Sequence, residues 1–254
     1  MSKEKPDVRR SFAPVAANYV TSPYHAGREW LDEALELAQP RPSDRVLDVA
    51  TGTGNTALAL APHVAHVTGL DLTEEMIVQA RRVAAERAIG NVDWVLGDAE
   101  ELPFPDASLD VWIARAAPHH FHRLDLALAE AVRVLRPGGR AVVIDSSGPR
   151  EARDLLHRVE LLRDPSHVRM LTLDEWIDRL EAAGLVVEEA RLRQLEWDFE
   201  PWITRVGVPA EKVEGLAAIV EGATGAAREQ LRPERREGKL WHLYWHALLR
   251  ARKP

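Results

Sequence analysis

A glycine-rich loop with the sequence VATGTGNTA runs from Val49 to Ala57 and follows directly on a short apolar run. Glycine lets the backbone turn tightly and lets a ligand approach the main chain, so Gly52 and Gly54 suit a ligand-binding loop. The spacing Gly52-x-Gly54-x-x-Ala57 fits the fingerprint of dinucleotide-binding loops, and it fits an adenosyl-binding loop equally well. The loop alone leaves three interpretations open: a dinucleotide, an adenosyl ligand, or a tight turn without a ligand.

Aspartates accompany three successive apolar runs of the sequence. Asp48 lies inside the first run, Asp71 closes the second, and Asp98 follows the third. An acid placed like Asp71 can accept hydrogen bonds from both hydroxyls of a ribose, which suits NAD and an adenosyl cofactor alike. Asp98 is placed to accept from an adenine amino group, and Ala99 offers its backbone amide beside it.

The charge of these aspartates separates the two ligand classes. A carboxylate buried at Asp48 must be hydrogen-bonded or paired, so it holds loop amides or faces a cationic ligand. The dinucleotide fingerprint requires no acid at that position. Three acids around one cleft would repel a pyrophosphate, whereas a positively charged sulfonium would be accepted. The acids therefore favour a sulfonium-bearing adenosyl cofactor.

Strands and helices that must position these residues are predicted to alternate along the chain from residue 44 to residue 146. Short apolar runs predict strands over 46–50, 64–70, 92–96, 109–114 and 140–145. Helical patterns lie between them, over 55–61, 73–87 and 124–135. Buried strands that alternate with helices indicate an α/β fold, with a parallel sheet covered by helices on both faces.

The flanking segments have a different pattern. Residues 12–39 are predicted to be helical with a break near Ser22, and a further strand is predicted over 185–194. Short helices broken by Pro201, Pro209 and Gly222 are expected over 199–231. The segment 240–249 alternates, so we expect a half-buried strand at the antiparallel end of the sheet. Its apolar face would hold Trp241, Leu243, Trp245, Ala247 and Leu249, and its other face His242, Tyr244 and His246.

Composition excludes several classes of protein. The 254 residues include no cysteine, which excludes a disulfide scaffold, a thiolate zinc site and a cysteine nucleophile. The net charge of −7 argues against nucleic acid as a partner. No apolar run approaches the roughly 18 residues of a membrane span, and the first twenty residues lack the apolar core of a signal peptide. We therefore expect a cytoplasmic protein without a membrane span.

Four motifs together resemble the class I S-adenosylmethionine-dependent methyltransferases, in particular the branch that includes the ubiquinone/menaquinone-biosynthesis methyltransferases. They are VLDVATGTGNTA from Val46, GLDLT from Gly69, GDAEELPFPDASLD from Gly97 and EAVRVLRPGGRAVVID from Glu130. The resemblance extends over residues 12 to 195, and the set is specific in its order and spacing. One departure is Ala50, which stands where the usual loop has its first glycine.

The resemblance implies a Rossmann-like, seven-stranded sheet with an antiparallel last strand and S-adenosylmethionine across its carboxyl edge. Loop residues would hold the methionine part, Asp71 the ribose, and Asp98 the adenine. Tyr19 would lie over the ligand from an N-terminal cover helix, although it would also fit a helix residue packed on the sheet. The implied cofactor contacts are Tyr19, Asp48, Ala50, Gly52, Gly54, Asp71, Leu72, Met76, Asp98, Ala99 and Arg115.

Methyl transfer needs an aligned acceptor, and it needs a base only where the acceptor must lose a proton. His119 and His120 follow the fourth strand, in a loop that should face the methyl group. A histidine with a pKa near neutrality could take a proton from a phenol or an activated ring carbon. Alternatively, the two histidines cap the next helix or hold the loop. We expect no metal site, since the acids already have roles and no second ligand set stands out.

Two further groups are candidates for the acceptor pocket. Arg163 and His167 belong to a polar cluster that could line this pocket or form a surface turn with internal salt bridges. Trp197, with Phe199 and Trp202, would line a lid suited to an aromatic or lipid-like molecule, although such aromatic residues also fit a core.

These features lead to four expected segments: a helical cover over 1–40, a cofactor-binding core over 41–195, a helical lid over 196–238, and a final strand over 239–254. The leading hypothesis is an enzyme that methylates oxygen or carbon of a small aromatic or quinone-like acceptor. An NAD-dependent oxidoreductase and a cofactor-binding regulatory protein without transfer activity are the alternatives. The oligomeric state stays open, with a homodimer as one option.

Overall fold

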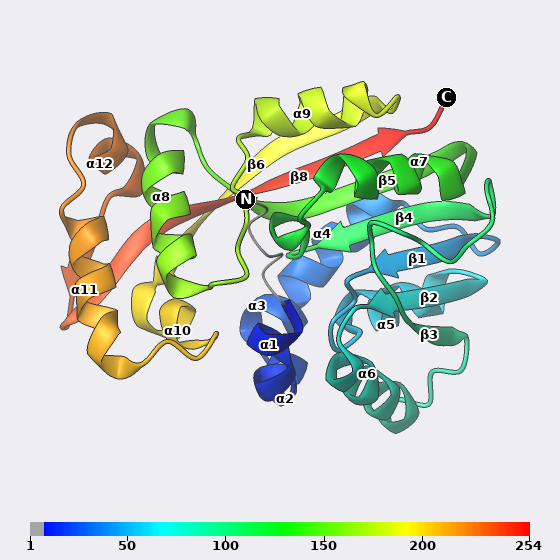
Figure 1. Ribbon diagram of the computed structural model, residues 1–254, viewed down its shortest axis with the longest axis horizontal. Helices are drawn as coiled ribbons and strands as arrows, with labels where there is room; N and C mark the ends of the chain where they lie inside the picture. Colours follow the sequence, from blue (N-terminus) through cyan, green and yellow to red (C-terminus); the bar gives the residue numbers. More distant parts are fainter. Residues whose placement is uncertain (1–7) are drawn as a thin grey trace, which may run out of the picture.

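The computed structural model describes residues 8–254, which form a mixed sheet flanked by helices (Figure 1). The strand order is β3-β2-β1-β4-β5-β8-β6, and a short strand β7 pairs with β8. Neighbours among β1 to β5 pair in parallel, whereas β8 is antiparallel to both β5 and β6. The strands are β1 (Arg45–Val49), β2 (His66–Asp71), β3 (Val92–Leu96), β4 (Leu109–Arg115), β5 (Leu135–Ser147), β6 (Val186–Asp198), β7 (Glu234–Arg236) and β8 (Lys239–Arg252). The expected seven-stranded, Rossmann-like sheet is confirmed, and β7 adds an eighth strand.

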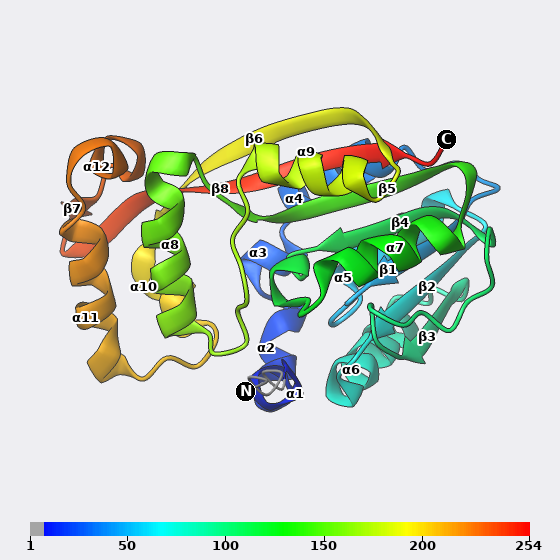
Figure 2. The ribbon, with the colours of Figure 1, turned by 45° about the horizontal axis from the view of Figure 1, so that its top comes forward.

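Helices cover both faces of the sheet, as the alternation predicts (Figure 2). The helices before β6 are α1 (Val8–Phe12), α2 (Ala16–Val20), α3 (Pro23–Ala26), α4 (Arg28–Ala38), α5 (Asn55–Leu60), α6 (Glu74–Glu86), α7 (Leu124–Val134), α8 (Arg150–Arg163) and α9 (Leu173–Ala182). Those after β6 are α10 (Phe199–Thr204), α11 (Ala210–Glu221) and α12 (Gly225–Leu231). Within residues 8–254, no helix has both the length and the apolar character needed to cross a membrane.

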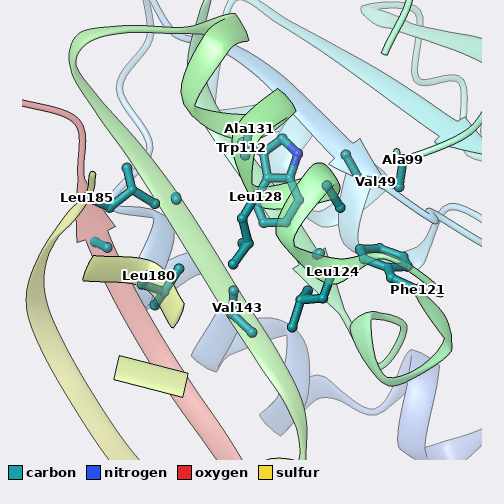
Figure 3. Packing of buried hydrophobic residues seen from close by; sticks show 14 of the residues in the cluster. Val49, Ala99, Trp112, Phe121, Leu124, Leu128, Ala131, Val143, Leu180 and Leu185 are labelled. Atoms are coloured by element: carbon teal, nitrogen blue, oxygen red, sulfur yellow. The ribbon is translucent and has the colours of Figure 1, made fainter. Parts of the chain in front are cut away.

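Strand β4 shows how the two halves of the core arise. Its side chains alternate between the faces: Trp112 packs with α7 and α9 on one side, and Ile113 packs with α4 and α5 on the other. Figure 3 shows the first side, where Leu124 and Leu128 of α7 lie over Trp112 and Val143. Because both faces of β4 are buried, its sequence is a nearly continuous apolar run.

The expected antiparallel final strand is confirmed, whereas the expectation that it is half-buried is wrong. Strand β8 lies between β5 and β6, so β6 forms the edge of the sheet. The face expected to be polar is the more buried one, since Tyr244 and His246 are 0% exposed while Leu243 is only half-buried. Helices α3 and α4 cover this face, and the His246 ring lies 4.5 Å from that of Trp30. Period-2 alternation identified the strand but could not show that a distant segment covers its polar face.

Helices α8, α10, α11 and α12 gather beyond one end of the sheet (Figure 1). They share an apolar cluster that includes Leu156, Phe199, Trp202 and Leu216. Pro201 does not break a helix as expected, since it lies in the first turn of α10, where a missing backbone N–H is tolerated. The segment 196–238, which the sequence predicts to be a helical lid, therefore packs together with α8.

The N-terminal helices α1 and α2 lie between α6 and α10 in both overall views (Figures 1 and 2). Phe12, Ala16 and Tyr19 pack against Met76 of α6, which fixes this segment over the carboxyl edge of the sheet. The first seven residues of the expected 1–40 cover lie outside the described part of the chain.

Candidate active site

A cavity of about 980 Å³, measured with its opening, lies at the carboxyl ends of β1 to β4. Parallel strands of an open sheet bring their carboxyl ends to one edge, so residues distant in sequence converge there. Ten of the eleven expected cofactor residues line this cavity: Tyr19, Asp48, Ala50, Gly52, Asp71, Leu72, Met76, Asp98, Ala99 and Arg115.

Gly54 is the exception: it does not line the cavity, and a glycine is needed there for packing and backbone conformation. Its φ of +82° favours glycine, and a Cβ there would lie 2.4 Å from a ring carbon of Trp94. Gly54 therefore allows the loop to pack against β3, whereas Gly52, with a φ of +54°, faces open space.

Asp48 organises the glycine loop from inside β1. Its Oδ2 accepts hydrogen bonds from the Thr51 hydroxyl at 2.5 Å and from the Ala57 amide at 3.0 Å. Burial raises the pKa of Asp48 to about 6, although both of these hydrogen bonds favour the ionised form. Of the two roles that the sequence left open for Asp48, the holding of loop groups is therefore present in the structure.

Asp71 is held at the end of β2 by the backbone on both sides of the cavity. Its Oδ2 accepts from the Gly52 amide at 2.7 Å and its Oδ1 from the Thr73 amide at 2.8 Å. Asp71 lines the cavity, and a carboxylate in that place can accept hydrogen bonds from the hydroxyls of a ribose. Leu72 and Met76 provide apolar surface beside it. These residues fit the adenosyl part of S-adenosylmethionine.

Arg115 has a structural role that sequence reasoning missed. Its guanidinium donates to the carbonyl of His25 at 2.6 Å and to that of Tyr24 at 3.3 Å. Its Nε donates to the Thr56 hydroxyl at 2.8 Å. The side chain therefore ties the N-terminal cover to α5, in addition to the backbone position that the resemblance implies.

A second cavity, of about 380 Å³ measured with its opening, adjoins the first. The two share Phe12, Tyr19, His25, Ala116 and His120. Among the expected acceptor and base residues, His119, His120, Arg163 and Trp197 line it, whereas His167 does not. The ring of Trp197 stacks on Tyr244 at 4.9 Å, so it belongs to a packed aromatic layer that also forms a cavity wall.

The two neighbouring histidines have opposite electrostatic environments. His119 Nδ1 lies 2.6 Å from Asp145 Oδ1, at the end of β5. Burial lowers the pKa of His119, but the Asp145 carboxylate outweighs it, and the pKa is raised above its usual value. Burial and the nearby positive charge of His119 lower the pKa of His120 to about 3, so His120 stays neutral. Its Nδ1 lies 3.1 Å from the Ser166 hydroxyl.

The cluster from Arg163 to Arg169 is not a surface turn, because Arg163 and His167 are only 7% and 3% exposed. Arg163 forms a buried ion pair with Glu160, which also accepts from the Tyr244 hydroxyl at 2.5 Å. His167 Nε2 lies 3.1 Å from His157 Nδ1, and burial lowers the pKa of His167 to about 2.

Sequence reasoning missed Asp145, Glu160 and Arg205 as residues of this region. Asp145 closes a predicted strand in the same way as Asp71, and that position could have identified it. Glu160 and Arg205 lie on α8 and directly after α10, outside the four motifs, so no local signal marks them. Within residues 8–254, no group of three or more His, Asp or Glu side chains is arranged to hold a metal ion.

The strand order with an antiparallel β8, the glycine loop after β1 and the acid at the end of β2 define a class I S-adenosylmethionine-dependent methyltransferase. Comparisons with known proteins agree. A methyltransferase domain family matches residues 46–139. The uncharacterized methyltransferase YcgJ of Bacillus subtilis (strain 168) is 35% identical over 220 residues, which cover 86% of this chain and 87% of that protein.

The chain therefore belongs to the methyltransferase family, and its cofactor is S-adenosylmethionine rather than NAD. The solved structure of YcgJ superposes with a TM-score of 0.83 and 32% identity, covering 88% of this chain and 97% of that one. The ubiquinone/menaquinone biosynthesis C-methyltransferase UbiE of Dinoroseobacter shibae is 44% identical over 124 residues. That match covers 47% of this chain and 49% of UbiE.

Proposed function

We propose that this methyltransferase transfers the methyl group to oxygen or carbon of a small aromatic or quinone-like acceptor held in the second cavity. The observation that carries the proposal is the position of this cavity, which adjoins the cofactor cavity and shares five lining residues with it. Its walls include the rings of Tyr19, Tyr24, Trp197 and Trp202. Such walls suit a planar, apolar molecule with a few polar groups. The partial match to a ubiquinone/menaquinone biosynthesis enzyme supports a quinone-like acceptor.

His119 is the proposed general base. Its Nδ1 is engaged by Asp145, which leaves Nε2 for the proton of an acceptor hydroxyl or an acidic ring position. Asp145 orients the ring and stabilises the imidazolium that forms when the proton arrives. S-adenosylmethionine, when bound, supplies an electrophilic methyl group, so positioning by the protein accounts for most of the remaining catalysis. His120, with its lowered pKa, holds the loop and contacts the acceptor.

The cofactor contacts follow from the first cavity. We propose that Asp71 binds the ribose hydroxyls and that Asp98 and Ala99 bind the adenine, while Leu72 and Met76 pack against the adenosyl group. Asp98 Oδ1 accepts from the Glu100 amide at 2.9 Å, which fixes its carboxylate at the cavity wall. Tyr19 closes the cavity from the cover, beside Phe12.

Methyl transfer from labelled S-adenosylmethionine to a panel of phenols and hydroquinones tests this function. Asp71→Ala should weaken binding of S-adenosylhomocysteine at least about tenfold, because two charge-assisted hydrogen bonds are lost. His119→Gln should retain that binding and lower kcat by about 10²-fold or more. His63→Gln, at an exposed histidine outside both cavities, is the matched control.

Because the pKa of His119 is raised, activity should fall as the pH drops through a value above 6.5. Asp145→Asn should move this fall to lower pH, since the carboxylate that raises the pKa is gone. Binding of S-adenosylhomocysteine without transfer to any acceptor would favour the regulatory alternative. Full activity of His119→Gln on a true acceptor would show that His119 is not the base.

A further inference from the structure

The charged groups of the second cavity are paired with one exception. Arg163 is paired with Glu160, and His119 with Asp145. Asp164 accepts from the Ser166 amide and hydroxyl at 2.9 and 2.6 Å, and its Oδ2 lies 3.9 Å from His120 Nε2. Arg205 also lines this cavity, and none of the carboxylates within residues 8–254 forms an ion pair with it.

Aromatic rings contact the guanidinium of Arg205, but its Nε lacks a hydrogen-bond acceptor within residues 8–254. Its Cζ lies 4.8 Å from the ring centroid of Tyr24 and 5.7 Å from that of Trp197. Cation–π contacts of this kind act on the flat face of a guanidinium. The N–H groups point outward in its plane, and the buried Nε has no hydrogen-bond acceptor among the described residues.

The environment of Arg205 disfavours its positive charge. Burial is the main cause of a lowered pKa at Arg205, and the guanidinium of Arg163 adds to it. Burial lowers the pKa of His25 on the shared wall, and the charge of Arg205 lowers it further. Arg205 is half-buried, with its Nε fully buried, and a charge in such a place without an ion-pair partner is costly, so it is expected to acquire a counter-ion from a ligand.

We propose that Arg205 binds an anionic group, a carboxylate or a phosphate, on the methyl acceptor. This inference rests on the proposed function, because it assumes that the acceptor occupies the second cavity. A planar guanidinium can bind either group through two parallel N–H···O bonds. The rings of Tyr24 and Trp197 fix the plane of the guanidinium and would leave the edge of Arg205 for the anion. The acceptor class is therefore narrowed to small aromatic acids or phosphate esters.

The test uses the full-length protein, saturated with S-adenosylhomocysteine, and isothermal titration with matched probes. Benzoate and phenyl phosphate present the two anions on one aromatic ring, and benzamide is the neutral analogue. We expect the better anion to bind at least about tenfold more tightly than benzamide. Arg205→Gln should abolish this preference, and Arg158→Gln, at an exposed arginine of α8, should retain it.

The outcomes separate this inference from the proposed function. Failure of S-adenosylhomocysteine to bind would count against the cofactor site itself. If the cofactor product binds but neither anion is preferred over benzamide by the unmodified protein, the anion site is wrong and the methyltransferase stands. An undiminished preference in Arg205→Gln would place the anion elsewhere. A preference for benzoate over phenyl phosphate, or the reverse, identifies the anion.

Discussion

Ala50 shows at the scale of one residue how this loop departs from the usual pattern. Its φ of +52° lies in the left-handed region, which disfavours any side chain with a Cβ. The family's usual glycine would adopt this conformation without strain. The small methyl group still leaves the cavity open, because Ala50 is one of its lining residues.

Ala50→Gly should therefore stabilise the protein. We expect the free energy of unfolding to rise by about 0.5–1 kcal/mol, since relief of the strained φ exceeds the entropy that glycine adds to the unfolded chain. Ala129→Gly, at an exposed position inside α7, is the control and should lose about 1 kcal/mol. Urea denaturation measures both changes, and equal losses would show that Ala50 is not strained.

Helix α9 shows at the scale of one element how a local signal fixes a boundary. The sequence from Thr172 to Glu175 predicts a helix start, and the structure contains the full capping box. Glu175 N donates to the Thr172 hydroxyl at 3.3 Å, and Thr172 N donates to the Glu175 carboxylate at 2.8 Å. Because α9 supplies Trp176 and Leu180 to the core, this cap contributes to the stability of the whole sheet face.

Thr172→Ala should lower the free energy of unfolding by about 1 kcal/mol, because a backbone N–H at the helix start loses its acceptor. Thr224 provides a matched control. It stands at the N-cap of α12, where its side chain makes no capping hydrogen bond. Thr224→Ala should change the stability by much less, as followed by thermal unfolding. A similar loss in both variants would assign the effect to something other than the cap.

At the scale of the whole molecule, buried histidines should make stability depend on pH. Burial lowers the pKa values of His120, His167 and His242 to about 3, 2 and 4. Between about pH 4 and 6.5 the unfolded chain binds protons at these sites and the folded chain does not. Stability should therefore rise with pH across this window. Asp48 opposes this trend, because its pKa of about 6 lets the folded state retain a proton there.

The pKa values of His25, His157 and His246 are lowered as well, whereas Asp71 and His119 join Asp48 in having raised pKa values. Because the lowered histidines outnumber the groups with raised pKa values, we expect a net loss of stability on acidification. We expect the free energy of unfolding at pH 5 to be lower than at pH 7, by an amount on the order of a few kcal/mol. Urea titrations at the two pH values measure it. His242→Gln, at a residue that lines neither cavity, should reduce the difference. A stability that is equal at both pH values would contradict the burial of neutral histidines.

The sequence by itself determined the parts of this protein that depend on local pattern. Periodicity placed β1 to β4 close to their observed bounds, and the motif set identified the family and its cofactor. Residues such as Asp71 could be predicted to lie at the cofactor cavity because the carboxyl ends of parallel strands must meet at one edge of the sheet.

Only the tertiary structure decided what lies in the second cavity. Arg205 and Glu160 line this cavity, and Asp145 contacts His119, which lines it too. The pairing of these charges, or the lack of it, depends on how α8 and α10 pack beyond the sheet. The buried polar face of β8 has the same origin, since α3 and α4 cover it from the other end of the chain. Periodicity reports which faces of a segment differ, whereas the packing of distant segments decides which face is buried and which charge lacks a partner.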